Sequence, residues 1–401
     1  MVRLGDVFER QITGEWGSEC LETKTGTNIL RTTNFTSDGV INYNNVVVRS
    51  IEKSKVESKR LHYGDIILEK SGGTDKTPVG RVVFCDPYIE TGTYLCNNFT
   101  QAMRVNPSMA VPKYVFYFMW NLHWSGKTEL MQNKTTGIKN LQVKSYLNQA
   151  LPLPSLDEQR RIAATLDKVT DLISKRRQQL DKLDELVKAR FVEMFGDLAD
   201  PKCQYARCKL VGACVDPDDI KCGPFGTQLS KDEYQESGVA VWEIPQINSG
   251  FKEYPTHFLT AEKARQLSAY SLIPGDIAMS RKGNVGRCGL YPKTFKPGII
   301  HSDVLRIRVD SNRVDPCFMM YQLHFSRAVE RQIEMVSSGA IMAGINVTKL
   351  KHIYVHIPPV NLQRQFTYFV DQTENIKTTI SRSLEKLETL KKALMQEYFG
   401  T

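Results

Sequence analysis

The 401-residue chain lacks the sequence features of membrane-spanning, secreted, disulfide-linked and zinc-binding proteins. It has no apolar run near the ~20 residues that a membrane-spanning helix needs. Its first residues, MVRLGDVFERQ, lack the apolar core of a signal peptide, so we expect a cytoplasmic protein. Nine cysteines without any C-x-x-C pair favour free thiols over a disulfide framework or a zinc site, even where four of them gather between residues 203 and 222.

Motifs for several common enzyme activities are also missing. An amino-methyltransferase needs an Asn- or Asp-Pro-Pro-aromatic loop, whereas the only Pro-Pro pair, at residues 358–359, follows Ile357. No G-x-G-x-x-G motif opens a helix, so no cofactor-binding loop is indicated. Residues 125–128 (SGKT) resemble the end of a P-loop, but its first glycine is replaced by Asn121. We therefore expect no catalytic residue, no metal site and no cofactor in this chain.

What the chain does contain is a long segment with helix signals, residues 153–197. Ser155 and Glu158 have the spacing of a capping box, and Gly196 is a stop signal. Apolar side chains then recur at alternating steps of four and three residues, with Arg176 and Arg190 in two of the slots, which predicts a helix packed lengthwise on another helix. A helix from residue 159 to residue 195 is about 55 Å long.

A second segment, residues 357–401, repeats the first without a gap at an offset of 204 residues. Pro154 aligns with Pro358, Gln159 aligns with Gln363, and both segments end in Phe-Gly. We interpret the two segments as long helices that pair antiparallel as a coiled coil. The predicted seam of this pair consists of Ile162, Leu166, Val169, Ile173, Leu180, Leu183, Val187, Phe366, Val370, Ile380, Leu384, Leu387 and Leu394.

The other two segments, residues 1–152 and 198–356, look like diverged copies of one mixed α/β domain. Gly-Asp-Ile occurs at 64–66 and at 275–277, where glycine allows a tight turn and aspartate caps it. In the first copy we predict strands at 28–35, 46–49, 65–68, 81–85 and 101–105, a buried helix at 112–124 and strand-like structure at 137–153. The predicted fold is α+β, with two α/β domains joined by two long antiparallel coiled-coil helices in a pseudo-twofold internal repeat.

The net charge of +9 lies in the two predicted domains. Residues 1–150 carry 18 Lys and Arg against 14 Asp and Glu, and residues 201–356 carry 20 against 15. The two helical segments are nearly balanced. A basic surplus on globular domains favours a polyanionic partner.

Loops that combine Lys, Arg and amide side chains with glycine are the candidates for DNA contacts. Arg and Lys read base edges and bind phosphates, and glycine lets the backbone come close. In the first domain the candidates are Lys70, Lys76, Arg81, Lys134 and Lys139. In the second domain they are Trp242, Gln246, Arg281, Lys282, Arg287, Lys293 and Lys296. Each of them is alternatively an ordinary solvated loop residue.

The two Pro-x-x-[Asp/Asn]-x-Gln-Arg helix starts, each after a globular domain, resemble the specificity subunit of type I restriction–modification enzymes. The resemblance covers the full chain and is strongest at residues 147–196. It implies two target-recognition domains that each read one half of a bipartite, asymmetric site in double-stranded DNA. It also implies helices that set the spacer and dock two methyltransferase subunits, which in turn recruit two restriction subunits. Catalysis, S-adenosylmethionine, ATP and Mg would belong to those partners, so the chain itself is implied to be non-catalytic.

Two other functions stay open on the sequence alone. A self-contained nuclease or methyltransferase with fused recognition domains would bind a cofactor as an isolated chain. A coiled-coil adaptor that acts without nucleic acid would show no salt-sensitive DNA binding.

Overall fold

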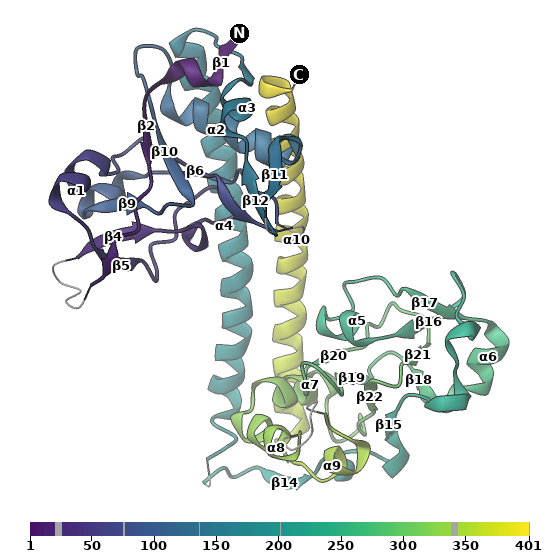
Figure 1. Cartoon of the computed structure of the whole chain (residues 1–401). Helices are drawn as coiled ribbons and strands as arrows, with labels where there is room; N and C mark the ends of the chain where they lie inside the picture. The colour runs from purple at the N-terminus through teal and green to yellow at the C-terminus, as the bar shows by residue number, and fades with distance from the viewer. Residues whose placement is uncertain (21–25, 75–76, 136, 201, 338–343, 401) are drawn as a thin grey trace. The chain divides into compact units, whose positions relative to one another are not determined.

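The computed structural model describes residues 1–20, 26–74, 77–135, 137–200, 202–337 and 344–400 (Figure 1). The chain forms two compact units: unit 1 is Met1–Gln178 with Ser381–Thr401, and unit 2 is Gln179–Ile380. The two long helices, α4 (Leu156–Phe195) and α10 (Val360–Phe399), each contribute to both units. None of the helices in the described ranges is long and apolar enough to span a membrane.

Unit 1 is built on small sheets beside a buried helix. The strand orders are β2-β10-β6-β8, β3-β5-β4-β9, β11-β12-β7 and β1-β13. The strands are β1 (Val2–Arg3), β2 (Phe8–Thr13), β3 (Ser18–Glu19), β4 (Thr27–Leu30), β5 (Val47–Ser50), β6 (Ile66–Glu69), β7 (Ser71–Gly73), β8 (Val82–Phe84), β9 (Tyr94–Cys96), β10 (Thr100–Val105), β11 (Gln132–Thr135), β12 (Ile138–Leu141) and β13 (Ala150–Leu151). The helices are α1 (Lys53–Lys59), α2 (Pro112–Trp124) and α3 (Val143–Leu147).

Unit 2 repeats much of this topology, but its described residues form three named sheets where those of unit 1 form four. Its sheets have the orders β15-β22-β19-β20, β17-β16-β21-β18 and β14-β23. The strands are β14 (Ala206–Lys209), β15 (Ile220–Cys222), β16 (Val239–Trp242), β17 (His257–Leu259), β18 (Ser271–Leu272), β19 (Ile277–Ser280), β20 (Cys288–Leu290), β21 (Gly298–Ile300), β22 (Val304–Ile307) and β23 (Tyr354–Ile357). The helices are α5 (Ile244–Asn248), α6 (Ala261–Gln266), α7 (Pro316–Phe325), α8 (Arg327–Ser337) and α9 (Val347–Lys351).

The sequence predictions for the first domain agree with these elements except near its end. The strands predicted around β4, β5, β6, β8 and β10 are present, and helix α2 has the predicted bounds. Residues 137–153 are only partly strand-like, because α3 forms a turn of helix between β12 and β13. The buried Tyr146 of α3 packs into the core of unit 1, so packing outweighs the local alternation of apolar and polar residues.

Each long helix begins at the repeated proline motif. At the start of α4, Ser155 Oγ accepts a hydrogen bond from Glu158 N at 3.3 Å, which is one half of the predicted capping box. The other half is missing because the Glu158 carboxylate pairs with Arg161, one turn further along. Gly196 follows the last helical residue with φ +71°, a left-handed conformation that ends helices well.

The repeated glutamine of this motif ties each long helix to its globular domain. Gln159 is 1% exposed; its Oε1 accepts a hydrogen bond from Val111 N, just before α2, and its Nε2 donates to Pro154 O, both at 2.9 Å. Gln363 accepts from the backbone N–H just before α7 at 2.8 Å and donates to the proline carbonyl before α10 at 2.6 Å. One buried amide therefore satisfies backbone groups of two segments that would otherwise lose hydrogen bonds.

Both Gly-Asp-Ile sequences form the predicted tight turn into a central strand. Gly64 has φ +89° and Gly275 has φ +93°, which L-residues with a side chain rarely adopt. The carboxylates of Asp65 and Asp276 each accept a hydrogen bond at 2.8 Å from the backbone N–H three residues earlier. The turn and its cap are thus the same in both units.

The same aspartates make a second interaction that the local motif does not reveal. Arg104 donates two hydrogen bonds of 2.8 Å to Asp65, and Arg308 donates two of 2.7 and 2.8 Å to Asp276. The hydrogen bonds with Asp65 raise the pKa of Arg104, and those with Asp276 raise the pKa of Arg308. Because both carboxylates are nearly fully buried, each turn is fastened to a neighbouring strand by a bidentate ion pair.

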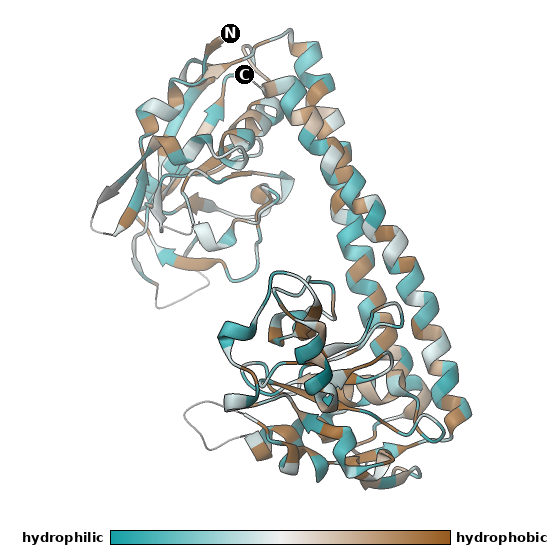
Figure 2. Cartoon of the chain, turned by 90° about the vertical axis from the view of Figure 1, so that its right-hand side faces the viewer, coloured by the Kyte–Doolittle hydropathy of each residue, from teal (hydrophilic) through white to brown (hydrophobic). Residues whose placement is uncertain are grey.

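Apolar positions recur along both long helices (Figure 2). In unit 1, the first half of α4 and the last half of α10 share a core that includes Leu166 and Met395. In unit 2, the end of α4 packs on the start of α10 through Phe191 and Phe366, whose rings lie 5.4 Å apart. The buried seam residues are Ile162, Leu166, Val169, Ile173, Val187, Phe366 and Val370, and the half-buried ones are Leu180, Leu183, Ile380, Leu384, Leu387 and Leu394.

Candidate nucleic-acid interface

The candidate lysines of the first domain come from two loops that meet on one small sheet. Lys70 precedes β7, Lys134 lies on β11 and Lys139 on β12, and these strands are hydrogen-bonded in the order β11-β12-β7. Lys134 stands directly opposite Lys139, and Lys139 stands opposite Gly73. The sheet therefore gathers basic positions from sequence segments more than 60 residues apart. Lys76 lies outside the described residues.

Unit 2 has the same backbone pairing at the equivalent place. Leu141 N donates to Lys70 O at 2.8 Å in unit 1, and Ile345 N donates to Arg281 O at 3.1 Å in unit 2. Lys282, the residue after Arg281, bridges to Gly344. The pairing makes Lys70 and Arg281 equivalent residues, so the candidates chosen separately in each domain share one structural position.

Arg281 and Lys282 also have partners within unit 2. The Arg281 guanidinium donates to the carbonyls of Ile345 and Ser302 at 3.2 Å each, and it lies 4.9 Å from the centre of the Phe225 ring. Lys282 Nζ lies 2.8 Å from the Asp303 carboxylate. These contacts hold both side chains close to the surface of the unit.

Arg81 has a structural partner that the sequence did not indicate. Its guanidinium donates two 2.8 Å hydrogen bonds to Glu69, which is 4% exposed, and these bonds raise the pKa of Arg81. Glu69 ends β6 and Arg81 precedes β8, so the pair closes the loop between two neighbouring strands. Any contact of Arg81 with DNA would have to share this guanidinium with Glu69.

Three other candidates of unit 2 are exposed. Arg287, Lys293 and Lys296 all lie on the surface. Arg287 and Lys293 line a cleft of about 890 Å³ beside the long helices, which also contains Lys188 and Lys252. The cleft contains acidic side chains as well, namely Asp184, Glu185, Asp371 and Glu374. Its electrostatic character is mixed rather than uniformly basic.

Trp242 and Gln246 are core residues. Trp242 is 3% exposed and packs on Phe251 with ring centres 5.2 Å apart. Gln246 is 2% exposed, and its side chain bonds to the backbone of Glu243 and of Tyr254. A side chain held in this way is not available to a base edge, so the structure corrects the candidate set by removing these two residues.

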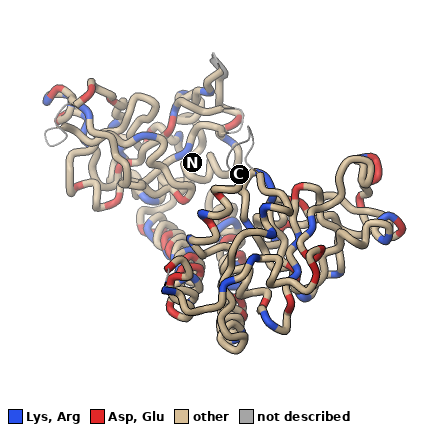
Figure 3. The backbone as a smooth tube through the Cα atoms, turned by 90° about the horizontal axis from the view of Figure 1, so that it is seen from below, with Lys and Arg blue, Asp and Glu red and all other residues tan. Residues whose placement is uncertain are grey.

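Basic and acidic positions are interspersed over both units (Figure 3). The basic surplus of each domain is therefore a modest excess over a mixed surface.

Comparison with known proteins identifies the architecture. The chain matches the family described as the type I restriction modification DNA specificity domain over residues 1–184 and 224–391. The chain belongs to this family. The two matched stretches correspond to the two repeated halves, so each half carries the family's domain.

Individual members of the family are distant relatives. The chain is 22% identical over 289 residues to the MjaVIII type I restriction enzyme specificity subunit of Methanocaldococcus jannaschii. This alignment covers 70% of this chain and 68% of that protein. It is 21% identical over 358 residues to the StySPI specificity subunit of Salmonella potsdam, covering 86% and 75%. A crystal structure of the type I S subunit from M. genitalium has the same fold, with a TM-score of 0.59 at 15% identity over 99% of this chain and 95% of that one.

Family membership confirms the predicted DNA-recognition role of a type I specificity subunit. The relatives named above are specificity subunits, and none of them supports the alternative of a self-contained nuclease or methyltransferase.

Proposed function

We propose that each unit reads one half of a bipartite, asymmetric site in double-stranded DNA. The observation that carries this proposal is the repeated pairing of basic strands, Lys70 beside Leu141 in unit 1 and Arg281 beside Ile345 in unit 2. Two equivalent surfaces on diverged domains are what a protein needs to recognise two different half-sites. Lys139 in unit 1 and the exposed Arg287 in unit 2 are the side chains that we assign to base or phosphate contacts.

The proposal is tested by changing one unit at a time. Lys70→Ala with Lys139→Ala is expected to relax the methylated motif in one half only, and Arg287→Ala in the other half only. Each lost base contact weakens binding by about 1–3 kcal/mol. Matched controls are Lys53→Ala and Arg265→Ala, exposed basic residues of the same units outside these surfaces, which leave the motif unchanged. Equal loss of discrimination in both halves would contradict the proposal.

We further propose that α4 and α10 form an antiparallel coiled coil that sets the spacer between the half-sites. Within unit 1, Arg177 of α4 bonds to Glu388 of α10 at 2.8 Å, and within unit 2, Lys377 of α10 bonds to Asp184 of α4 at 2.6 Å. These bonds and the apolar seam support pairing along each half. A 40-residue helix is about 60 Å long, and half-sites on one face of a duplex lie ~34 Å apart.

Inserting four residues after Leu180, with a matching insertion after Leu384, tests the spacer role. One extra helical turn adds ~6 Å, and a base pair adds ~3.4 Å, so the spacer is expected to grow by one or two base pairs. Both half-sites should stay the same. Methylome sequencing of cells that carry the variant measures the motif, and an active variant with an unchanged spacer would refute the role.

We also propose that the chain docks two methyltransferase subunits, and through them two restriction subunits, along the outer faces of the long helices. Large apolar side chains are exposed there, including Leu172, Leu186, Tyr368, Ile376 and Leu390, each at least 45% exposed. The chain itself is proposed to be non-catalytic and cytoplasmic, with S-adenosylmethionine, ATP and Mg bound by the partners. Methyl transfer to adenine by the purified chain without a partner would overturn this assignment.

A further inference from the structure

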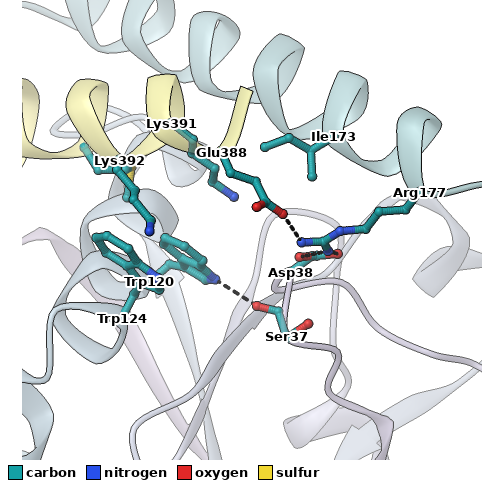
Figure 4. Close-up of a pocket in the computed structure, with 10 residues that line it drawn as sticks. Ser37, Asp38, Trp120, Trp124, Ile173, Arg177, Glu388, Lys391 and Lys392 are labelled. Carbon is teal, nitrogen blue, oxygen red and sulfur yellow. Dashed lines mark hydrogen bonds and ion pairs between the residues drawn. The ribbon is translucent and has the colours of Figure 1, made fainter. Parts of the chain in front are cut away.

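Unit 1 contains a cavity of about 290 Å³ between helix α2, the first half of α4 and the last turns of α10 (Figure 4). Its base is apolar, because Ile173 is 4% exposed and Met395 is fully buried. One wall consists of Trp120 and Trp124 of α2, whose rings are 5.8 Å apart and within 7° of parallel. Trp124 is 45% exposed, so this wall reaches the surface.

Two lysines of α10 face this aromatic wall (Figure 4). The Lys391 ammonium lies 4.2 Å from the centre of the Trp120 ring, and that of exposed Lys392 lies 5.8 Å from the centre of Trp124. Lys391 is only 9% exposed, and among the described residues it has no hydrogen bond or ion pair. Burial lowers the pKa of Lys391; the charge of Asp38 opposes this shift, and the charges of Arg177 and Lys113 add to it.

The acidic side chains of the cavity are already engaged by another cation. Arg177 bonds to Asp38 and to Glu388, each at 2.8 Å (Figure 4). Neither carboxylate is within ion-pair distance of Lys391. The cavity therefore combines an aromatic wall, an apolar base and the ammonium of a largely buried lysine that has no hydrogen-bond acceptor in the described part of the chain.

The repeat-related place in unit 2 does not have this combination. Helix α2 begins at Pro112 and helix α7 begins at Pro316, and these two prolines are also 204 residues apart. At this offset, Trp120 corresponds to His324, Trp124 to Ala328 and Lys391 to Val187. The tryptophan–lysine cavity is thus a property of one half of an otherwise repeated protein.

We propose that this cavity receives an aspartate or glutamate side chain of a partner protein that binds once per chain, through unit 1. The carboxylate would accept hydrogen bonds from Lys391 and Lys392, and its aliphatic stem would pack on the exposed face of Trp124. Because one side is open, the site suits a side chain that projects from a larger surface better than a small molecule, which needs enclosure. Asp38 and Glu388 disfavour a phosphate dianion.

This inference goes beyond the proposed function, in which partners use features that both units share. It depends only on unit 1, so failure of half-site reading or of spacer control would leave it intact.

The test uses the full chain labelled with 5-fluorotryptophan, because its four tryptophans report on separate places. The probe is acetyl-Leu-Glu-Leu-amide, and the matched control peptide carries Gln in place of Glu. The Glu peptide is expected to shift the fluorine signals of Trp120 and Trp124 saturably, while those of Trp16 and Trp242 stay in place. The Gln peptide should bind about tenfold more weakly, since a charge-assisted hydrogen bond is lost.

Two variants assign the effect to the buried ammonium. Lys391→Met keeps an unbranched apolar stem and is expected to weaken binding of the Glu peptide about tenfold. Lys386→Met changes an exposed lysine of the same helix outside the cavity and should bind as the wild type does. Unchanged Trp16 and Trp242 signals in Lys391→Met show that the fold is intact, and Lys391→Gln serves as a second variant if they move.

Four results would overturn the proposal. They are equal binding of the Glu and Gln peptides, full binding by Lys391→Met, the same saturable shift with inorganic phosphate alone, and no shift at Trp120 and Trp124.

Discussion

Units 1 and 2 agree where buried backbone groups need partners and differ where side chains meet solvent. Gln159 and Gln363 share two equivalent hydrogen bonds, and Asp65 and Asp276 form the same turn and ion pair. The cavity of Trp120, by contrast, corresponds to a cleft of unit 2 that has His324 and Val187 in place of Trp120 and Lys391. The comparison teaches that the scaffold is held by a few buried polar residues, because an unsatisfied buried group is costly, while the surfaces are free to differ.

The largest expected effect is loss of the buried aspartate. Asp65→Ala and Asp276→Ala should each destabilise their unit by about 3–5 kcal/mol, because an arginine and a backbone N–H lose a buried partner. Urea unfolding combined with hydrogen exchange of β6 and β19 measures the two effects separately. Asp157→Ala is the control, since its side chain is 94% exposed and its ion pair contributes little. If only one of the two substitutions destabilised its unit strongly, the two aspartates would not be equivalent.

The next effect concerns the anchor glutamines. Gln159→Leu and Gln363→Leu should each cost about 1–3 kcal/mol for the backbone groups that lose a partner. Gln363 is expected to matter more, because its Nε2 also reaches Arg313 O at 3.3 Å. Hydrogen exchange at the first turns of α2 and α7 reports the loss, and exposed Gln178→Leu is the control. An effect that is larger for Gln159 would reverse the predicted order.

The smallest expected effect concerns two lysines of α10 whose pKa values are shifted in opposite directions. Burial by itself lowers the pKa of Lys377, but hydrogen bonds to Asp184 and Glu374 outweigh it and raise the pKa above 10.5. Burial of Lys391 lowers its pKa below 10.5. At neutral pH, Lys377→Met should therefore destabilise unit 2 and Lys391→Met should stabilise unit 1, each by less than about 1 kcal/mol.

The pH dependence of this last pair has a definite direction. The stabilisation by Lys377 is fully present below pH 10.5 and is lost as the pH rises through its raised pKa. The cost of Lys391 is present below its lowered pKa and is relieved as the pH rises towards 10.5. Urea unfolding from about pH 8 to about pH 11 measures the free energy of unfolding of each variant relative to the wild type. The same pH trend for both variants would refute the predicted difference.

Much of the fold could be predicted from sequence because its signals are local or periodic. The bounds of α2, the ends of α4 and α10 and the Gly-Asp-Ile turns follow from capping, spacing and backbone preference. The candidate site was less accessible to this reasoning. Trp242 and Gln246 read as loop residues but are buried, and Arg81 has a partner 12 residues away that no local pattern indicates.

The sequence alone determined the repeat, the two long helices and the family resemblance, because helical periodicity and helix starts depend on neighbouring residues. Only the tertiary structure decided which charged groups are paired. Asp65 finds Arg104, Lys70 meets the strand of Lys139, and Lys391 remains without an acceptor among the described residues. These outcomes depend on segments far apart in the chain, and the free energy of a charge depends on its burial and partners, which sequence distance does not specify.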